Sequence, residues 1–115
     1  MKTLRYCFAL DLIDDERLIA EYVHYHKPDI IWPEIVEGIK ACNILEMNIY
    51  LAGNRLMMML ETNEDFNLVR DFERMGTLSR QKDWAELMLT LQKQLPFAKQ
   101  NEHWVKMNQI FNLNA

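Results

Sequence analysis

Residues 18–34, LIAEYVHYHKPDIIWPE, decide the fold, because they hold a helical pattern, a break and a second helix start in close succession. Leu18, Tyr22 and His26 recur at i, i+4 and i+8, which places them on one stripe of an α-helix. Pro28 ends this helix, and Pro33 is typical of the first turn of another. The stretch predicts two helices joined by a turn, with the His26 imidazole at the end of the first.

The residues before and after this stretch predict a first strand and a hairpin. Residues 4–12 alternate between two faces, as a strand does, and Asp14 or Asp15 can cap the helix that follows. The second helix stops near Asn43. Residues 44–51 and 55–61 are rich in strand formers, and Gly53-Asn54 between them suits a type II′ hairpin turn.

The last third of the chain predicts a second helix pair and a final strand. Residues 63–65 offer caps for a helix carrying Phe66, Val69, Phe72 and Met75. A further helix is expected from about Arg80 to Leu95, closed by Pro96, because its apolar residues keep a strict helical period. Residues 104–113 return to an extended pattern.

This order of elements predicts one α+β domain over residues 1–115. It matches the ferredoxin-like split βαβ arrangement, a four-stranded antiparallel sheet with the helices on one face. In the third strand, Met57 and Met59 alternate with Leu56, Met58 and Leu60, so both sheet faces are apolar. We therefore expect a homodimer that packs sheet against sheet, as in a dimeric α/β barrel.

Composition argues against several classes of function. A net charge of −4 and scattered Lys and Arg residues disfavour nucleic-acid binding. No apolar run reaches the roughly 18 residues needed to cross a membrane, and the amino terminus does not resemble a signal peptide, so a cytoplasmic protein is expected. Cys7 and Cys42 lack the spacing of a metal or disulfide motif and are interpreted as small buried hydrophobes.

Spacing alone leaves the chemistry of the candidate side chains open. The His26 imidazole could exchange protons near neutral pH, but a single histidine on an apolar stripe is more often structural. His24 faces nearly the opposite direction, so a two-histidine metal site is not expected, and His103 is interpreted as solvated surface. Tyr22, Trp32 and Trp84 fit either a ligand contact or ordinary core.

Several motifs together resemble the L-rhamnose mutarotase family and its relatives that act on L-fucose. They are Arg5-x-x-Phe8, Glu21-Tyr22-x-x-x-His26, Ile31-Trp32-Pro33-Glu34, Ile49-Tyr50-Leu51 and Trp84, spread over nearly the whole chain. The Tyr-x-x-x-His motif followed by Trp-Pro-Glu is the most specific of them. The resemblance implies a dimeric ferredoxin-like enzyme that uses no metal or organic cofactor and interconverts the anomers of a 6-deoxy sugar.

Residue by residue, the resemblance implies that His26 is the acid/base, that Tyr22 contacts the monosaccharide and that Trp84 closes the pocket. Trp32 shapes the pocket. Where rhamnose enzymes have a substrate-contacting tyrosine this chain has Met47, and where they have two tryptophans it has Asp83-Trp84. The chain also has about two extra residues between His26 and Trp32. Met47 and Asp83 are therefore candidate substrate contacts, and these departures argue against L-rhamnose. The patterns of residues 47–50 and 53–56 are more similar to the fucose-type relatives, so the resemblance favours L-fucose over L-rhamnose.

Three hypotheses of function follow. The first is a mutarotase in which His26 moves the protons. The second is a non-catalytic small-molecule-binding protein with the same dimeric architecture. The third, a cofactorless oxygenase, rests on analogy of fold alone and ranks last.

Overall fold

The centre of the sheet is β1 (Thr3–Leu12), seen here in a computed structural model that describes residues 2–115. β1 pairs antiparallel along nearly its whole length with β3 (Arg55–Asn63), and β3 pairs with β2 (Ile44–Ala52). Gly53 in the connecting turn has a φ of 60°, as the first position of a type II′ turn requires. The predicted first strand and hairpin are confirmed.

The opposite edge of β1 is covered by two short strands. The second lies within the predicted last strand, and the first was not predicted. β4 (Gln92–Lys93) pairs with the end of β1, and β5 (Val105–Met107) pairs with its middle, so the strand order is β2-β3-β1-β4 with β5 also on β1. The predicted strand over residues 104–113 was therefore too long. Residues 108–115 pair with no strand, and Ile110 is 97% exposed.

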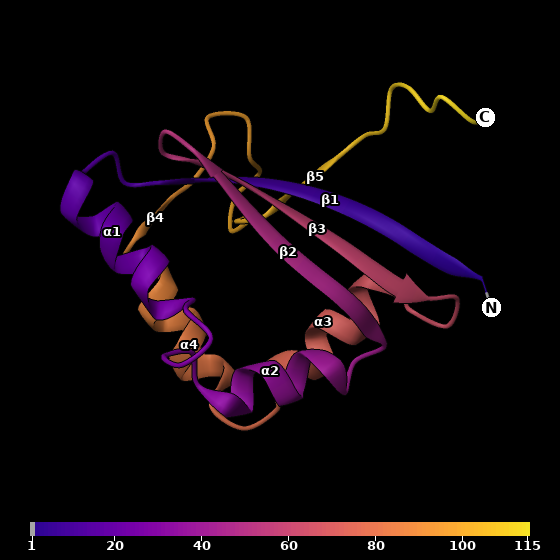
Figure 1. Ribbon diagram of the computed structural model, residues 1–115, viewed down its shortest axis with the longest axis horizontal. Helices are drawn as coiled ribbons and strands as arrows, with labels where there is room; N and C mark the ends of the chain where they lie inside the picture. The colour runs from indigo at the N-terminus through magenta and orange to yellow at the C-terminus, as the bar shows by residue number, and fades with distance from the viewer. Residues whose placement is uncertain (1) are drawn as a thin grey trace.

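Four helices lie on one face of this sheet, as Figure 1 shows. They are α1 (Glu16–Tyr25), α2 (Pro33–Lys40), α3 (Leu68–Gly76) and α4 (Gln81–Leu89). The predicted α+β class, with an antiparallel sheet and its helices on one side, is confirmed. No helix within residues 2–115 is both long enough and apolar enough to span a bilayer.

The start of α3 differs from the prediction. Its N-cap is Asn67, whose side chain accepts a hydrogen bond from the Arg70 amide at 2.9 Å. Asn63, one of the predicted caps, instead donates to the side chain of Asn43. Phe66 consequently lies before the helix, and Val69, which was expected to face inward, is 74% exposed.

The end of α4 also differs, because the predicted helix was six residues too long (Leu95 against Leu89). After Thr90 the chain turns back toward β1, and the Leu91 carbonyl accepts a hydrogen bond from the Ile13 amide at 3.0 Å. Leu91 and Leu95 are still buried. Their apolar spacing fitted a helix, but they reach the core from the non-helical residues on either side of β4.

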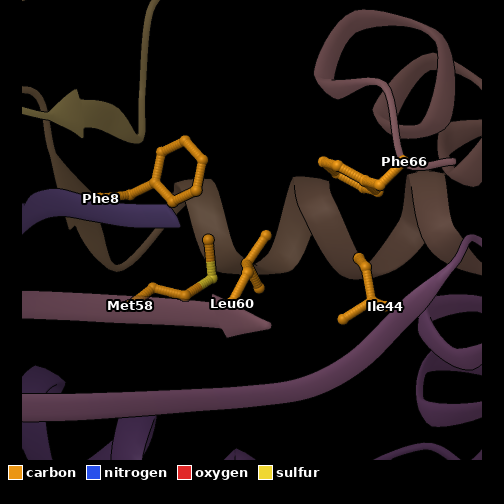
Figure 2. Packing of buried hydrophobic residues seen from close by; sticks show 5 residues of the cluster. All are labelled: Phe8, Ile44, Met58, Leu60 and Phe66. Atoms are coloured by element: carbon orange, nitrogen blue, oxygen red, sulfur yellow. The ribbon is translucent and has the colours of Figure 1, made fainter. Parts of the chain in front are cut away.

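The core lies between the sheet and the helices and has two parts. In the first, buried side chains from β1, β2, β3 and the segment before α3 converge, as Figure 2 shows for Phe8, Ile44, Met58, Leu60 and Phe66. The second joins the first helix and the last helix to the sheet and contains Leu12, Tyr22, Leu56, Met88 and Leu91. The second cluster fixes α1 and α4 against the sheet. The candidate site lies between the sheet and the helices.

Candidate active site

The histidine of the site is placed by the way α1 begins and ends. The Asp15 carboxylate caps the helix by accepting from the Leu18 amide at 3.0 Å. The helix ends at Tyr25, with His26 as the C-cap residue, and Pro28 cannot continue it. The imidazole is therefore held at the last turn of a short, firmly capped helix.

The hydrogen bond of His26 determines which ring nitrogen is free. Its Nδ1 lies 2.7 Å from the backbone carbonyl oxygen of Tyr22. A carbonyl can only accept, so Nδ1 carries the proton and donates it, which leaves Nε2 as the basic nitrogen of the neutral ring. Burial lowers the pKa of His26 below its ordinary value, and the bond to the Tyr22 carbonyl opposes this in part. The site therefore holds a neutral imidazole near pH 7.

Tyr22 lies one helical turn before the histidine and packs against it. The two rings are 4.4 Å apart between centroids and are tilted by 31°. The side chain is 3% exposed, and this burial raises the pKa of Tyr22 to about 12, although a hydrogen bond with Gln92 lowers it somewhat. The phenol thus keeps its proton and can donate it in a hydrogen bond.

Trp84 joins α4 to this pair. Its ring lies edge-to-face on His26 at a centroid distance of 5.3 Å, and a second edge-to-face contact at 6.4 Å joins it to Tyr25. Trp84 lies four residues before Met88 and so on the same face of α4, and Met88 is buried in the core. An indole, an imidazole and a phenol therefore form one continuous surface.

This surface lines a cavity of about 540 Å³ between the sheet and the helices. The volume lies within the range of small-molecule sites, roughly 300–1,000 Å³. One part of the lining is polar or aromatic and includes Tyr22, His26, Trp84 and Gln92. The remainder is largely aliphatic, with methionines and isoleucines from the sheet and from α2. A ligand that carries both hydroxyl groups and apolar surface would match this lining.

Four of the six candidate site residues from the sequence line the cavity: Tyr22, His26, Met47 and Trp84. Trp32 does not. It packs edge-to-face on Trp84 at a centroid distance of 5.3 Å, outside the lining. Asp83 is exposed in the first turn of α4 and is likewise outside the lining.

Other polar residues reach the cavity from the segment around β4 and β5. They are Gln92, Glu102, His103 and Lys106. His103, which was expected on solvated surface, is exposed but borders the cavity. Gln92 could not be found from the sequence, since its position fell inside the predicted helix, and no spacing linked the other three to α1.

Two other candidates from the sequence lie away from the site. His24 is exposed on the opposite side of α1 from the cavity lining, as its spacing predicted. Cys7 is half-buried and Cys42 is buried, and both are free thiols. Within residues 2–115, no three histidine, cysteine, aspartate or glutamate side chains are grouped as a metal site would need.

Fold and site together define a small α+β protein with a ligand-sized cavity that is lined in part by the His26 imidazole. The family model described as L-rhamnose mutarotase matches residues 5–113. The chain therefore belongs to the L-rhamnose mutarotase family, and mutarotases are isomerases.

Individual relatives agree with this assignment. The chain is 36% identical to a protein named L-fucose mutarotase from Xanthomonas campestris pv. campestris, over 99% of this chain and 91% of that one. It is 34% identical to a UPF0734 protein of Dictyostelium discoideum, over 95% and 89% of the two chains. The crystal structure of an L-rhamnose mutarotase from Formosa agariphila superposes with a TM-score of 0.64 at 18% identity, covering 96% of this chain and 98% of that one. That structure supports the fold.

Proposed function

We propose that this protein interconverts the α and β anomers of a 6-deoxy hexose, with L-fucose favoured over L-rhamnose. The observation that carries the proposal is the His26 imidazole on the cavity wall, whose Nδ1 is bound to the Tyr22 carbonyl, so that Nε2 is left as its basic nitrogen. Membership of the mutarotase family and the relative named L-fucose mutarotase support the same reaction.

Mutarotation needs one proton to leave the anomeric hydroxyl and one to reach the ring oxygen. In the proposed mechanism Nε2 of His26 takes the hydroxyl proton, and the resulting imidazolium returns a proton to the ring oxygen as the C1–O5 bond breaks. The open aldehyde rotates about C1–C2, and closure on the other face reverses the transfers. Because both oxygens are bonded to C1, one imidazole can reach each of them in turn, and the histidine ends the cycle neutral.

The other cavity residues have binding roles in this proposal. The protonated Tyr22 hydroxyl donates a hydrogen bond to a sugar hydroxyl, and Trp84 covers the apolar sugar face. Met47 contacts the substrate from β2. Trp32 and Asp83 lie outside the cavity lining and are not included among the direct contacts.

The test is anomer exchange followed by saturation-transfer NMR over a panel of L-fucose, L-rhamnose, D-galactose and D-ribose. The wild-type protein should accelerate exchange most for L-fucose. His26→Ala should lower the catalysed exchange rate by most of the roughly 10²- to 10⁴-fold that general acid–base catalysis contributes. His24→Ala is the matched control, because that imidazole lies on the same helix but away from the cavity. Equal exchange in His26→Ala and wild type would remove His26 from the mechanism.

The same experiment decides against the non-catalytic alternative. A binding protein would bind one of these sugars, with a change in tryptophan fluorescence, but would leave the exchange rate at its enzyme-free value. Sugar binding without any acceleration would therefore favour the binding protein over the enzyme.

We also propose that the active form is a homodimer in which one sheet packs on another. The face of the sheet opposite the helices carries the half-buried Cys7, Ala9, Met57 and Met59, and Tyr50 on the same face is exposed. Such an apolar face is costly to leave in water. Light scattering should give twice the 13.8 kDa chain mass, and Met59→Asp should reduce it to one chain mass. A monomeric wild-type protein would contradict this proposal.

A cytoplasmic location and a single mutarotase domain over residues 1–115 complete the proposal. The two free thiols suit a reducing compartment. Fractionation of the producing cells, with the protein followed by antibody, tests the location.

A further inference from the structure

Arg80, just before α4, has a backbone conformation that its residue type does not explain. Its φ and ψ are 63° and 3°, in the left-handed region, where glycine or asparagine is favoured. It is also the N-cap residue of α4, yet its side chain makes no capping hydrogen bond. Glycine would fit the backbone better and serine or aspartate would cap the helix better.

The side chain of Arg80 instead reaches across to the start of α2. Its guanidinium carbon lies 3.8 Å from the centroid of the Trp32 ring, which is a close cation–π contact. Its Nη1 lies 3.3 Å from Oε2 of Glu34. Trp32 and Glu34 flank Pro33, so Arg80 joins the first turns of α2 and α4, which lie next to each other in Figure 1.

Behind Arg80 the aromatic rings form an unbroken series that leads to the cavity. Trp32 packs edge-to-face on Trp84 at 5.3 Å, and Trp84 packs edge-to-face on His26 at 5.3 Å. Trp84 and His26 line the cavity, whereas Trp32 and Arg80 do not. Trp32 thus contacts both the Arg80 guanidinium and the cavity-lining indole of Trp84.

We propose that Arg80 is a positioning residue, which clamps Trp32 against Trp84 and so holds the indole in its sugar-binding orientation before the sugar arrives. The inference rests on the proposed function, because it assigns Trp84 to the sugar face. Arg80 itself touches no substrate. Without the guanidinium, Trp32 loses its cation–π contact with Arg80. Trp84 then occupies its present orientation only part of the time.

This role predicts a specific split between the kinetic constants. If the binding-competent orientation falls to about a tenth of the population, the apparent affinity for sugar falls by the same factor. Arg80→Gln should therefore raise KM about tenfold and leave kcat within about twofold, since the bound state is unchanged. Arg80→Lys keeps the charge but not the planar stacking group, so its KM should lie between those of the wild type and Arg80→Gln.

A purely structural role would give a different result. Partial unfolding would lower the active fraction, and hence kcat, with KM unchanged. Lys82→Gln is the matched control, because Lys82 is an exposed cation in the same helical turn. The far-ultraviolet circular dichroism couplet of the Trp32–Trp84 pair gives an independent readout: it should weaken in Arg80→Gln and persist in Lys82→Gln, with the helical signal equal in both.

An unchanged KM, or an undiminished tryptophan couplet, in folded Arg80→Gln would overturn the proposal. If the wild-type protein exchanges no sugar, the proposed function fails separately, and the couplet still decides whether Arg80 orders the tryptophan pair. The kinetic and spectroscopic results therefore distinguish a wrong reaction from a wrong role for Arg80.

Discussion

The pH dependence of anomer exchange follows directly from the environment of His26. Burial lowers the pKa of His26 below its ordinary value of 6.5, and the Tyr22 carbonyl fixes the proton on Nδ1. The form that can accept the hydroxyl proton is the neutral ring. We therefore expect an exchange rate that is constant above pH 7 and falls in acid with a midpoint below 6.5.

The size of this effect is set by the fraction of neutral imidazole. One pH unit below the midpoint about a tenth of the rate should remain, and two units below it about a hundredth, until the enzyme-free rate dominates. The free energy of unfolding should also fall as the pH is lowered. Because the pKa is lower in the folded state, the unfolded chain takes up the proton first as the pH drops below 6.5, so acid reduces the free energy of unfolding.

The assay is saturation-transfer NMR at constant ionic strength, with the enzyme-free rate subtracted at each pH. The imidazole proton signals of His26 give its pKa in the same samples. They can be assigned with His24→Ala and His103→Ala, which remove the other two histidines. A catalysed rate that rises as the pH falls from 7 to 5, or a His26 pKa above 6.5, would refute the reasoning.

Three further substitutions, and one control variant, test the site and the packing. Tyr22→Phe removes one hydrogen-bond donor, so KM should rise roughly 2- to 10-fold in the exchange assay, and an unchanged KM would show that the hydroxyl does not reach the sugar. Gly38→Ala places a Cβ against the buried Gln81 amide, which donates to the Ile35 carbonyl, and should lower the free energy of unfolding in urea by about 1–3 kcal/mol. Gly76→Ala, where the Cβ meets open space, is its control and should be neutral or stabilising by up to about 1 kcal/mol. Leu60→Ala, at a residue with 0% exposure, should cost about 2–5 kcal/mol in the same titration, and a loss under 1 kcal/mol would contradict the assigned core.

The parts of the fold that follow local rules could be predicted from the sequence. The alternation of β1, the Asp15 cap, Pro33 at the start of α2 and the glycine of the hairpin turn each depend on a few neighbouring residues. The length of α4 could not be predicted in this way. Leu91 and Leu95 are buried in either conformation, so apolar spacing did not separate a helix from an extended segment that pairs with β1.

In the site, too, only the contacts between near neighbours in sequence could be predicted. Tyr22 and His26 lie four residues apart on one helix, so their spacing brought them together. The arrival of Gln92 and His103 at the cavity depends on which edge of β1 the end of the chain joins, and that is a long-range property. Trp32 fitted both a ligand contact and a packing role, and only its distance from Trp84 and Arg80 separates these interpretations.

One edge of β1 is paired with two short strands, β4 and β5, and these should separate from the sheet more easily than β3 does. β4 contributes two residues to the sheet and β5 contributes three, whereas β3 pairs with β1 over nine residues. The segment between β4 and β5 includes Glu102 and His103 on the cavity wall. Segments with so few ladder bonds open at lower free energy than the sheet they flank. Amide protons of Lys93 and Val105 should exchange with solvent well before those of Leu10 and Leu60, so this wall of the cavity can part from the sheet while the β1–β3 ladder stays closed.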